Sequence, residues 1–314
     1  MKKIPIIVDT DPGVDDAQAL IYLFKEPKFD LKLFVVNNAN IHVEKAERNL
    51  NFLLDTFNVD VPSVRGYHRL GKSSEFAYHM HGAEGLGHYK IKTPFSKTCI
   101  DADASDAIYE ILKANPKKVV YLELGSHSNL AYLFMKHPDS KDLIKRIVMM
   151  GGAPSGIRAN SAHKSFNIRT DAPAFQHTID SGVPVVMCPS SIGRDVTYLT
   201  YEQVQQVKKT NSVGKMLGKM FETYWEPGYK EKIIATCDLA AAYYIVHPRL
   251  YRTYKASVTV DTKKDVGRII AKRDKNGQFR IIKDVNREKF IKLLFDDLKK
   301  YRKKEIPGIK KALK

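Results

Sequence analysis

The sequence predicts an α/β protein with an open, mostly parallel central sheet flanked by helices. Short apolar runs, rich in β-branched residues, alternate with helical patterns along most of the chain. Several of these runs end in glycine or small polar residues, which is typical of strands that lead into loops at one edge of a sheet. Neither an internal repeat nor a low-complexity linker interrupts the pattern, so we expect one domain over residues 1–314.

The expected elements follow one another in the order that a parallel sheet requires, with each strand after the first following a helix. A β-branched run at Ile6–Val8 predicts a buried first strand. The expected helices are Asp15–Lys25, Ala104–Ala114, Leu130–Arg146 and Ala172–Ser181. The strands expected after them are Leu31–Val36, Lys118–Leu124, Ile147–Met150 and Val183–Cys188. Arg65–Ser96, rich in histidine, glycine and tyrosine, is expected to be a long functional loop.

The last third of the chain is expected to add helices and a small β-hairpin. A helical stretch over Thr200–Tyr229 comes first. Strand-like runs follow at Ser257–Val260, Val266–Ala271 and Phe279–Ile282. The turn signal Asp274-Lys275-Asn276-Gly277 lies between the last two runs and predicts that they pair with each other. An amphipathic helix over about Arg287–Lys303 closes the fold, and residues 287–314 form a basic helix and tail.

Composition excludes several classes of protein. The chain has 314 residues, of which 43% are hydrophobic and 28% charged, as in an ordinary globular protein with ample core. Cys99, Cys188 and Cys237 are too few and too scattered for a disulfide framework or a zinc site, which favours a reducing compartment. No apolar run is as long as a membrane span, and the run after Met1-Lys2-Lys3 soon ends in acidic residues. We therefore expect a cytoplasmic protein with no membrane partner.

The net charge of +17 is concentrated partly near the carboxyl terminus, in Lys299–Lys304 and Lys310-Lys311. Clustered lysine and arginine could bind nucleic acid by releasing counterions from phosphates. No zinc finger, RNA-recognition signature or basic strand with interleaved aromatic residues accompanies the charge. We therefore expect no nucleic-acid partner and interpret the charge as a solvated helix face that also attracts anionic ligands.

The segment from Ile6 to Ala17 carries four carboxylates around a Pro12-Gly13 break. This break follows the first strand, at the edge where open α/β sheets bind their ligands. Like charges repel unless a cation neutralises them, and oxygen-only ligands select a hard ion such as Ca²⁺ or Mg²⁺. A solvated acidic turn that caps the next helix is the simpler alternative. Four acids are more than a cap requires, so the segment predicts a metal site.

Four motifs resemble those of the inosine-uridine nucleoside hydrolase family. The first is Asp9-Thr10-Asp11-Pro12-Gly13-Val14-Asp15-Asp16, which resembles the family's Asp-x-Asp-Pro-Gly-x-Asp-Asp signature. The others, in the family's order, are His79–Gly87, Leu122–Leu130 and Cys237–Tyr243. The resemblance extends from Ile6 to at least Pro248, and it implies an enzyme that splits ribonucleosides into free base and ribose.

The resemblance implies a Ca²⁺ site built from distant parts of the chain. Asp11, Asp16 and Asp238 match the family's side-chain ligands, and the carbonyl of Leu124 matches its backbone ligand. Together with water and ribose hydroxyls they would supply the about six to eight oxygens that Ca²⁺ takes. By the same resemblance, the ion would lower the pKa of a water molecule, and Asp11 would take its proton as general base. Flanking carboxylates would also stabilise an oxocarbenium-like transition state.

A second group of residues matches the family's substrate binders. These residues are Asp15, Asn40, Asn167, His81, Met150, Asn160, Tyr229 and Asp238. No motif sets the register between Met150 and Asn160. Structural alternatives exist for several: Asn40 could end a strand, Asn167 could satisfy a turn and Asp238 could cap a helix.

Two positions depart from the family pattern. Cys237 stands where purine-active members carry a histidine that protonates the leaving base, and a thiol is the weaker donor. Cys237 could equally be a small buried apolar residue. The other candidate acids are His81, His79, His163, Tyr224 and Tyr229. Ser165 replaces a glutamate that binds the 5′-hydroxyl, and Arg158, Lys164 and Arg169 lie nearby, so we consider 5′-modified or phosphorylated substrates as well.

Three functions therefore compete at this stage. The favoured one is a Ca²⁺-dependent nucleosidase with a slight preference for pyrimidine nucleosides, because a pyrimidine base has no N7 to protonate. A phosphatase of the haloacid dehalogenase type also places paired aspartates after its first strand. A nucleoside or ribose binder that has lost catalysis through Cys237 and Ser165 is the third. By analogy with the family, we expect a homo-oligomer, either a dimer or a tetramer.

Overall fold

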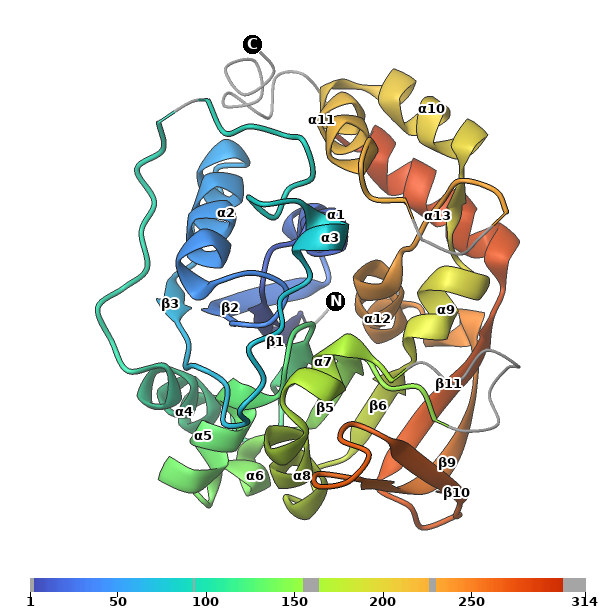
Figure 1. Cartoon of the computed structure of the whole chain (residues 1–314). Helices are drawn as coiled ribbons and strands as arrows, with labels where there is room; N and C mark the ends of the chain where they lie inside the picture. The colour runs from blue at the N-terminus through green and yellow to red at the C-terminus, as the bar shows by residue number, and fades with distance from the viewer. Residues whose placement is uncertain (1–2, 93, 155–163, 226–229, 302–314) are drawn as a thin grey trace.

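A large open sheet runs through the middle of the protein (Figure 1). The computed structural model describes residues 3–92, 94–154, 164–225 and 230–301. Within them, nine strands form this sheet in the order β10-β9-β11-β6-β5-β4-β1-β2-β3. The strands are β1 (Ile4–Thr10), β2 (Phe29–Val36), β3 (Ser63–Arg65), β4 (Val120–Glu123), β5 (Arg146–Met150), β6 (Val185–Cys188), β9 (Tyr251–Val260), β10 (Ile269–Arg273) and β11 (Phe279–Val285). A separate two-stranded sheet pairs β7 (Leu199–Thr200) with β8 (Ile233–Ile234).

The pairing confirms the predicted fold class. Every neighbouring pair from β11 to β3 is parallel, and the sheet does not close into a barrel. The predicted hairpin between residues 266–271 and 279–282 is wrong, because β9 lies between β10 and β11 and pairs antiparallel with both. The turn at Asp274–Gly277 does reverse the chain, but it carries the chain across the middle of β9, where the Asp274 amide donates to the Lys255 carbonyl. The hairpin of this region is β9–β10.

Helices cover both faces of the sheet, and the alternation along each strand separates two cores. Ile6 and Val8 of β1 belong to one core and Ile7 to the other. The first core contains α1 (Val14–Lys25), α2 (Val43–Thr56), α9 (Ser190–Asp195), α10 (Tyr201–Thr210), α11 (Ser212–Phe221), α12 (Cys237–Val246) and α13 (Arg287–Lys299). The second core contains α4 (Ala104–Ala114), α5 (Ser128–Lys136) and α8 (Ala172–Asp180). The short helices are α3 (Tyr78–His81), α6 (Ser140–Leu143), α7 (Phe166–Thr170) and a 3₁₀ turn at Pro248–Leu250.

Two of the predicted helices are shorter than expected. The helix predicted over residues 130–146 is wrong as a single element, because the helix ends at Lys136 and Pro138 follows. Proline disfavours helical backbone in the residue before it. The stretch from Thr200 divides into α10 and α11 at Asn211, whose side chain accepts a hydrogen bond from the Gly214 amide and so starts a new helix. Among the described residues no helix is long and apolar enough to cross a membrane.

The strand order creates a crevice at one place on the sheet. From β1 the chain adds β2 and β3 on one side, whereas β4, β5 and β6 are added on the other side. The carboxyl ends of β1 and β4 therefore diverge into loops on opposite faces, at a topological switch point. Asp11 follows β1, and Leu124 follows β4. The fold thus brings two of the predicted site positions together.

Candidate active site

The loop between β1 and α1 is organised around the carboxylate of Asp16. Its Oδ1 accepts hydrogen bonds from Thr10 Oγ1 at 2.6 Å and from the Asp11 amide at 3.3 Å. Its Oδ2 accepts from the Gly13 amide at 3.0 Å and from Asn40 Nδ2 at 3.1 Å. This network fixes the tight turn that the Pro12-Gly13 break predicts.

Asp11 is held on one oxygen and left without a partner on the other. The Asn40 backbone amide donates to Asp11 Oδ2, while Asp11 Oδ1 is buried with no hydrogen-bond partner. Asn40 therefore holds Asp11 through its backbone and Asp16 through its side chain. The loop after β2 thus fixes the geometry of both acids.

Asp238 lies in the first turn of α12 and joins the amino-terminal acids, as the sequence predicts. Helix α12 packs against α1. Oxygen atoms of Asp15, Asp16 and Asp238 lie within 4.8 Å of one another, an arrangement that could hold a metal ion. Asp11 is not in this triplet, whereas Asp15, for which the sequence predicts sugar binding, is. Both carboxylate oxygens of Asp238 are buried without a partner.

Burial and mutual repulsion raise the pKa values of these acids. For Asp11 and Asp238 the pKa is far above its usual range, chiefly through burial and then through the neighbouring carboxylates. Burial raises the pKa of Asp15 and of Asp16 to about 6. In the described part of the chain, no lysine or arginine forms an ion pair with Asp11, Asp16 or Asp238. Buried oxygens without partners and without a counter-cation fit a hard metal ion.

His81 lies against the same loop. Its Nδ1 accepts a hydrogen bond from the Val14 amide at 3.1 Å and lies 3.9 Å from Asp15 Oδ1. A side chain at residue 13 would collide with the ring, because a Cβ there would lie 2.4 Å from Nδ1. Burial lowers the pKa of His81 to about 4. His81 is therefore a neutral imidazole that carries its proton on Nε2, and its ring packs against Tyr224 at a centroid distance of 5.1 Å.

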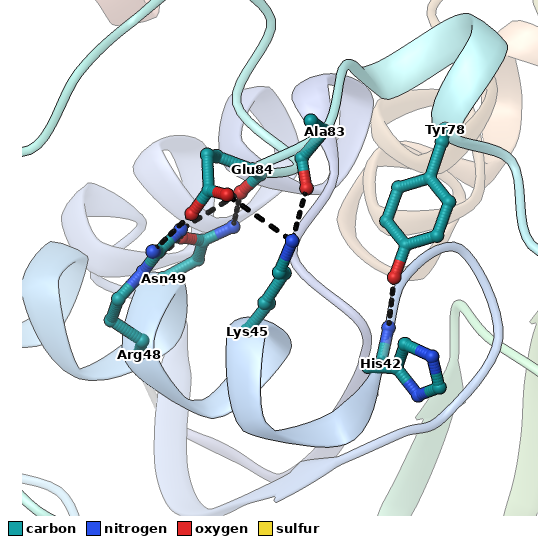
Figure 2. Close-up of polar contacts among 7 residues, drawn as sticks. All are labelled: His42, Lys45, Arg48, Asn49, Tyr78, Ala83 and Glu84. Atoms are coloured by element: carbon teal, nitrogen blue, oxygen red, sulfur yellow. Dashed lines mark hydrogen bonds and ion pairs between the residues drawn. The ribbon is translucent and has the colours of Figure 1, made fainter.

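A clamp on α2 fastens the loop that carries His81 (Figure 2). Glu84 forms ion pairs with Lys45, at 3.1 Å, and with Arg48. Beneath them the buried Asn49 Nδ2 donates to the Glu84 carbonyl at 2.8 Å and to the Pro12 carbonyl at 3.1 Å. Asn49 therefore joins the acid-bearing loop to the His81 loop.

On the sugar side of the predicted site, Asn167 joins two strand ends. Its Nδ2 donates to the Leu124 carbonyl at 2.6 Å and to the Met150 carbonyl at 3.4 Å. Since a carbonyl has two lone pairs, Leu124 can accept this bond and still bind a cation. The neighbouring cations are engaged elsewhere, because Lys164 pairs with Asp265 and Arg169 pairs with Glu75.

Cys237 begins α12 but is packed as a core residue. Its thiol donates to the Ser190 carbonyl at 3.5 Å, and a Cβ on Gly193 would lie 2.5 Å from its sulfur. Among the other candidates, His79 is exposed and Tyr224 hydrogen-bonds to Asp15. The predicted positions Asn160, Tyr229, His163 and Arg158 lie outside the described residues.

Sequence reasoning missed the network that supports the acid loop. The buried Asp9 accepts hydrogen bonds from Tyr121 at 2.6 Å, from Asn37 at 2.8 Å and from Asn129 at 3.0 Å. These partners come from β4, from the loop that follows β2 and from the first turn of α5. The signal that could have found such positions is a polar residue inside an apolar strand, or an asparagine on the buried face of a helix, as Asn49 is between Ala46 and Leu53 of α2.

The fold and this acid cluster define an open α/β enzyme whose candidate metal centre lies at the carboxyl edge of the sheet. The family model for inosine-uridine preferring nucleoside hydrolase matches residues 6–292, and the chain belongs to this family. The phosphatase alternative is therefore excluded.

Two kinds of relative agree with this assignment. The non-specific ribonucleoside hydrolase RihC of Escherichia coli O127:H6 is 33% identical over 266 residues, which cover 83% of this chain and 85% of that relative. The purine-preferring ribonucleoside hydrolase from Gardnerella vaginalis superposes with a TM-score of 0.84 at 26% identity, covering 94% of this chain and 98% of that one. A plant nucleoside hydrolase, PpNRh1, has the same fold, with a TM-score of 0.86 at 24% identity and coverage of 94% and 99%.

Proposed function

We propose that this protein hydrolyses the N-glycosidic bond of ribonucleosides to free base and ribose with the help of Ca²⁺. The observation that carries the proposal is the meeting of Asp238 with the acids of the first loop, more than two hundred residues away in the sequence. Family membership supplies the reaction class, and the buried oxygens supply the reason for a cation.

Asp11, Asp16, Asp238 and the Leu124 carbonyl are the proposed ligands, and Asp15 lies close enough to join them. When bound, Ca²⁺ would bind the ribose diol and lower the pKa of a water molecule. The protein itself supplies oxygens that are already oriented by Thr10, Gly13 and Asn40.

Asp11 is the proposed general base. Its Oδ2 is anchored by the Asn40 amide, so the unpartnered Oδ1 is the atom that takes the proton of the attacking water. Asp15, Asn40 and Asn167 are proposed to bind the ribose hydroxyls. Met150 and, in the segments outside the described residues, Asn160 and Tyr229 complete the proposed substrate contacts.

Among the candidate acids in the described part of the chain, none is a strong acid placed to protonate the leaving base. His81 is neutral at pH 7, and the Cys237 thiol is directed to a backbone carbonyl. We therefore propose that His81 positions the base or sugar through Nε2–H, and that pyrimidine nucleosides, which have no N7 to protonate, are slightly favoured. The carboxylate partners of Lys164 and Arg169 make a 5′-phosphate subsite the less favoured alternative.

A panel of uridine, cytidine, inosine, adenosine and uridine 5′-monophosphate tests the proposal, with reducing-sugar release measured before and after chelation. The proposal predicts ribose from unphosphorylated nucleosides, lost on chelation and restored by Ca²⁺. Binding of uridine without any ribose release would instead support a nucleoside-binding protein that has lost catalysis. The packed thiol of Cys237 makes this the second candidate function. The oligomer of two or four chains stays a prediction.

A further inference from the structure

A second concave site lies at the opposite edge of the sheet. A cavity of about 520 Å³ opens where β5, β6 and β11 begin. Along β5, Arg146 at this edge and Met150 near the acid cluster are separated by four strand steps, about 13 Å. The residues that line the cavity are Lys145, Arg146, Gly182, Pro184, Val185, Val186, Tyr244, Lys255, Asn276, Gly277, Gln278, Phe279 and Arg280.

Four of these lining residues are cationic and none is acidic. Lys145 and Arg146 come from the start of β5, Lys255 from β9 and Arg280 from β11. Among the described residues, no carboxylate forms an ion pair with any of the four. Elsewhere on the surface, some lysines and arginines are paired, as Lys45 is with Glu84 and Lys136 with Asp106. The cavity therefore gathers four cations without an ion pair, and Lys255 alone has a described carboxylate, that of Asp274, near enough to interact with its charge.

The clustering of these cations destabilises the fold at Arg146. The side chain is half-buried, and its Nε is buried with no hydrogen-bond partner. Burial lowers the pKa of Arg146, the nearby Tyr244 hydroxyl partly offsets this, and repulsion from Arg280 adds a smaller lowering. Leaving a buried charged donor unpaired destabilises a fold. A bound anion would neutralise this repulsion.

The rest of the cavity wall suits an organic group. Tyr244, Pro184 and Val186 are among the lining residues, whereas the Phe279 side chain is fully buried in the core beneath. The volume lies within the range of about 300–1,000 Å³ that is typical of pockets for small molecules. A concave site of this size fits a compact ligand better than it fits an extended polymer.

We propose that this cavity binds a small organic phosphate. The phosphate would lie among Lys145, Arg146 and Arg280, since guanidinium and ammonium groups are strong donors to phosphate oxygens. The organic part would rest on Tyr244. This site is independent of the proposed hydrolase activity, because it shares no residue with the acid cluster.

Calorimetric titration of the full-length, Ca²⁺-loaded protein tests the proposal, in about 0.15 M salt so that diffuse attraction is screened. The three probes are ribose 5-phosphate, inorganic phosphate and ribose. The test variant is Lys145→Ala/Arg280→Ala. The matched control is Lys272→Ala/Lys275→Ala, which removes two cations from the neighbouring β10 and its turn but leaves the cavity lining intact.

We expect saturable binding of ribose 5-phosphate that is tighter than that of inorganic phosphate. Ribose, whose proposed site is the acid cluster, should bind the wild type and the test variant equally. The test variant should weaken binding of ribose 5-phosphate about tenfold or more, and the control should not change it. Equal weakening in both variants would mean attraction by net charge alone, and that result overturns the proposal. So does unchanged binding in the test variant, equal affinity for inorganic phosphate, or no saturation.

A second measurement does not depend on the folding of a variant. In the wild-type protein, ribose 5-phosphate should slow acetylation of Lys145 and Lys255, followed by peptide mass spectrometry, and should leave Lys272 unchanged. Uniform acetylation of the three lysines with and without ribose 5-phosphate would contradict the site.

Discussion

The two edges of the central sheet carry opposite charges that the protein leaves unpaired. At the carboxyl edge, Asp11 and Asp238 are buried with carboxylate oxygens that have no partner. At the amino edge, Arg146 and its three cationic neighbours line a cavity without an acid. Unpaired like charges are costly, so their concentration in one place indicates a ligand of opposite charge. The carboxyl edge fits a metal ion, and the amino edge fits a phosphate.

The clamp on α2 shows the opposite case (Figure 2). Glu84 is half-exposed, and Lys45 and Arg48 lower its pKa. All its charge is satisfied within the protein, so it needs no ligand. The clamp therefore holds a loop in place and does not bind substrate.

The largest expected effect is at Asp11. Asp11→Asn keeps an oxygen that can accept the Asn40 amide but removes the charge and the proton acceptor, so kcat for uridine should fall by about 10³-fold. Asp30→Asn, which changes an exposed partner of Lys32, is the matched control and should leave kcat unchanged. Equal activity of the two variants would remove Asp11 from the mechanism.

After chelation, the repulsion among the acids at the carboxyl edge should make the free energy of unfolding depend on pH. The pKa of Asp15 and of Asp16 rises from 3.8 to about 6 in the folded protein. Because the unfolded chain releases these protons first, the free energy of unfolding of the metal-free protein should fall as pH rises from about 4 to 6. The rise in Tm on adding Ca²⁺ should therefore be larger at pH 7 than at pH 5. A larger rise at pH 5 would contradict this origin.

The buried part of the clamp should matter more than its exposed part. Asn49→Leu leaves the Pro12 and Glu84 carbonyls unpaired and should cost about 2 kcal/mol of unfolding free energy in urea. It should also weaken Ca²⁺ binding, because Pro12 lies in the acid loop. Glu84→Gln removes exposed ion pairs worth less than about 1 kcal/mol and should leave Ca²⁺ binding unchanged. If Glu84→Gln had the larger effects, the exposed ion pairs of Glu84, and not Asn49, would hold the acid loop in place.

The smallest effect should be at Cys237. If the thiol only packs against Gly193, Cys237→Ala should change kcat by less than about tenfold for uridine and inosine alike. A loss of about 10² or more confined to inosine would show that the thiol protonates purine bases.

Local patterns in the sequence were sufficient for the fold class, whereas the meeting of Asp238 with the first loop was predicted from the resemblance to the nucleoside hydrolase family. The sheet follows from alternating apolar runs, and the shared edge follows from parallel strands. The pairing of β9 with both β10 and β11 could not be predicted, because the Asp274–Gly277 turn shows that the chain reverses but not which strands pair.

The supporting contacts of the site were also beyond local patterns. Asn49 joins two loops by hydrogen bonds that span 37 and 35 residues, and Asp9 reaches Asn129 across 120 residues. Such contacts depend on tertiary packing, which no short window of sequence contains. The same is true of the cationic cavity, whose members are ordinary surface lysines and arginines until the strands β5, β9 and β11 bring them together.

Calorimetric titration of Ca²⁺ into the chelated wild-type protein and into Asp238→Asn tests the central claim most directly. We predict one ion per wild-type chain, with uridine hydrolysis returning in proportion to occupancy, and no measurable binding or hydrolysis for the variant. Wild-type affinity for Ca²⁺ in Asp238→Asn, or full hydrolysis by the chelated wild-type protein, would contradict the claim that acids from the two ends of the chain form one catalytic metal centre.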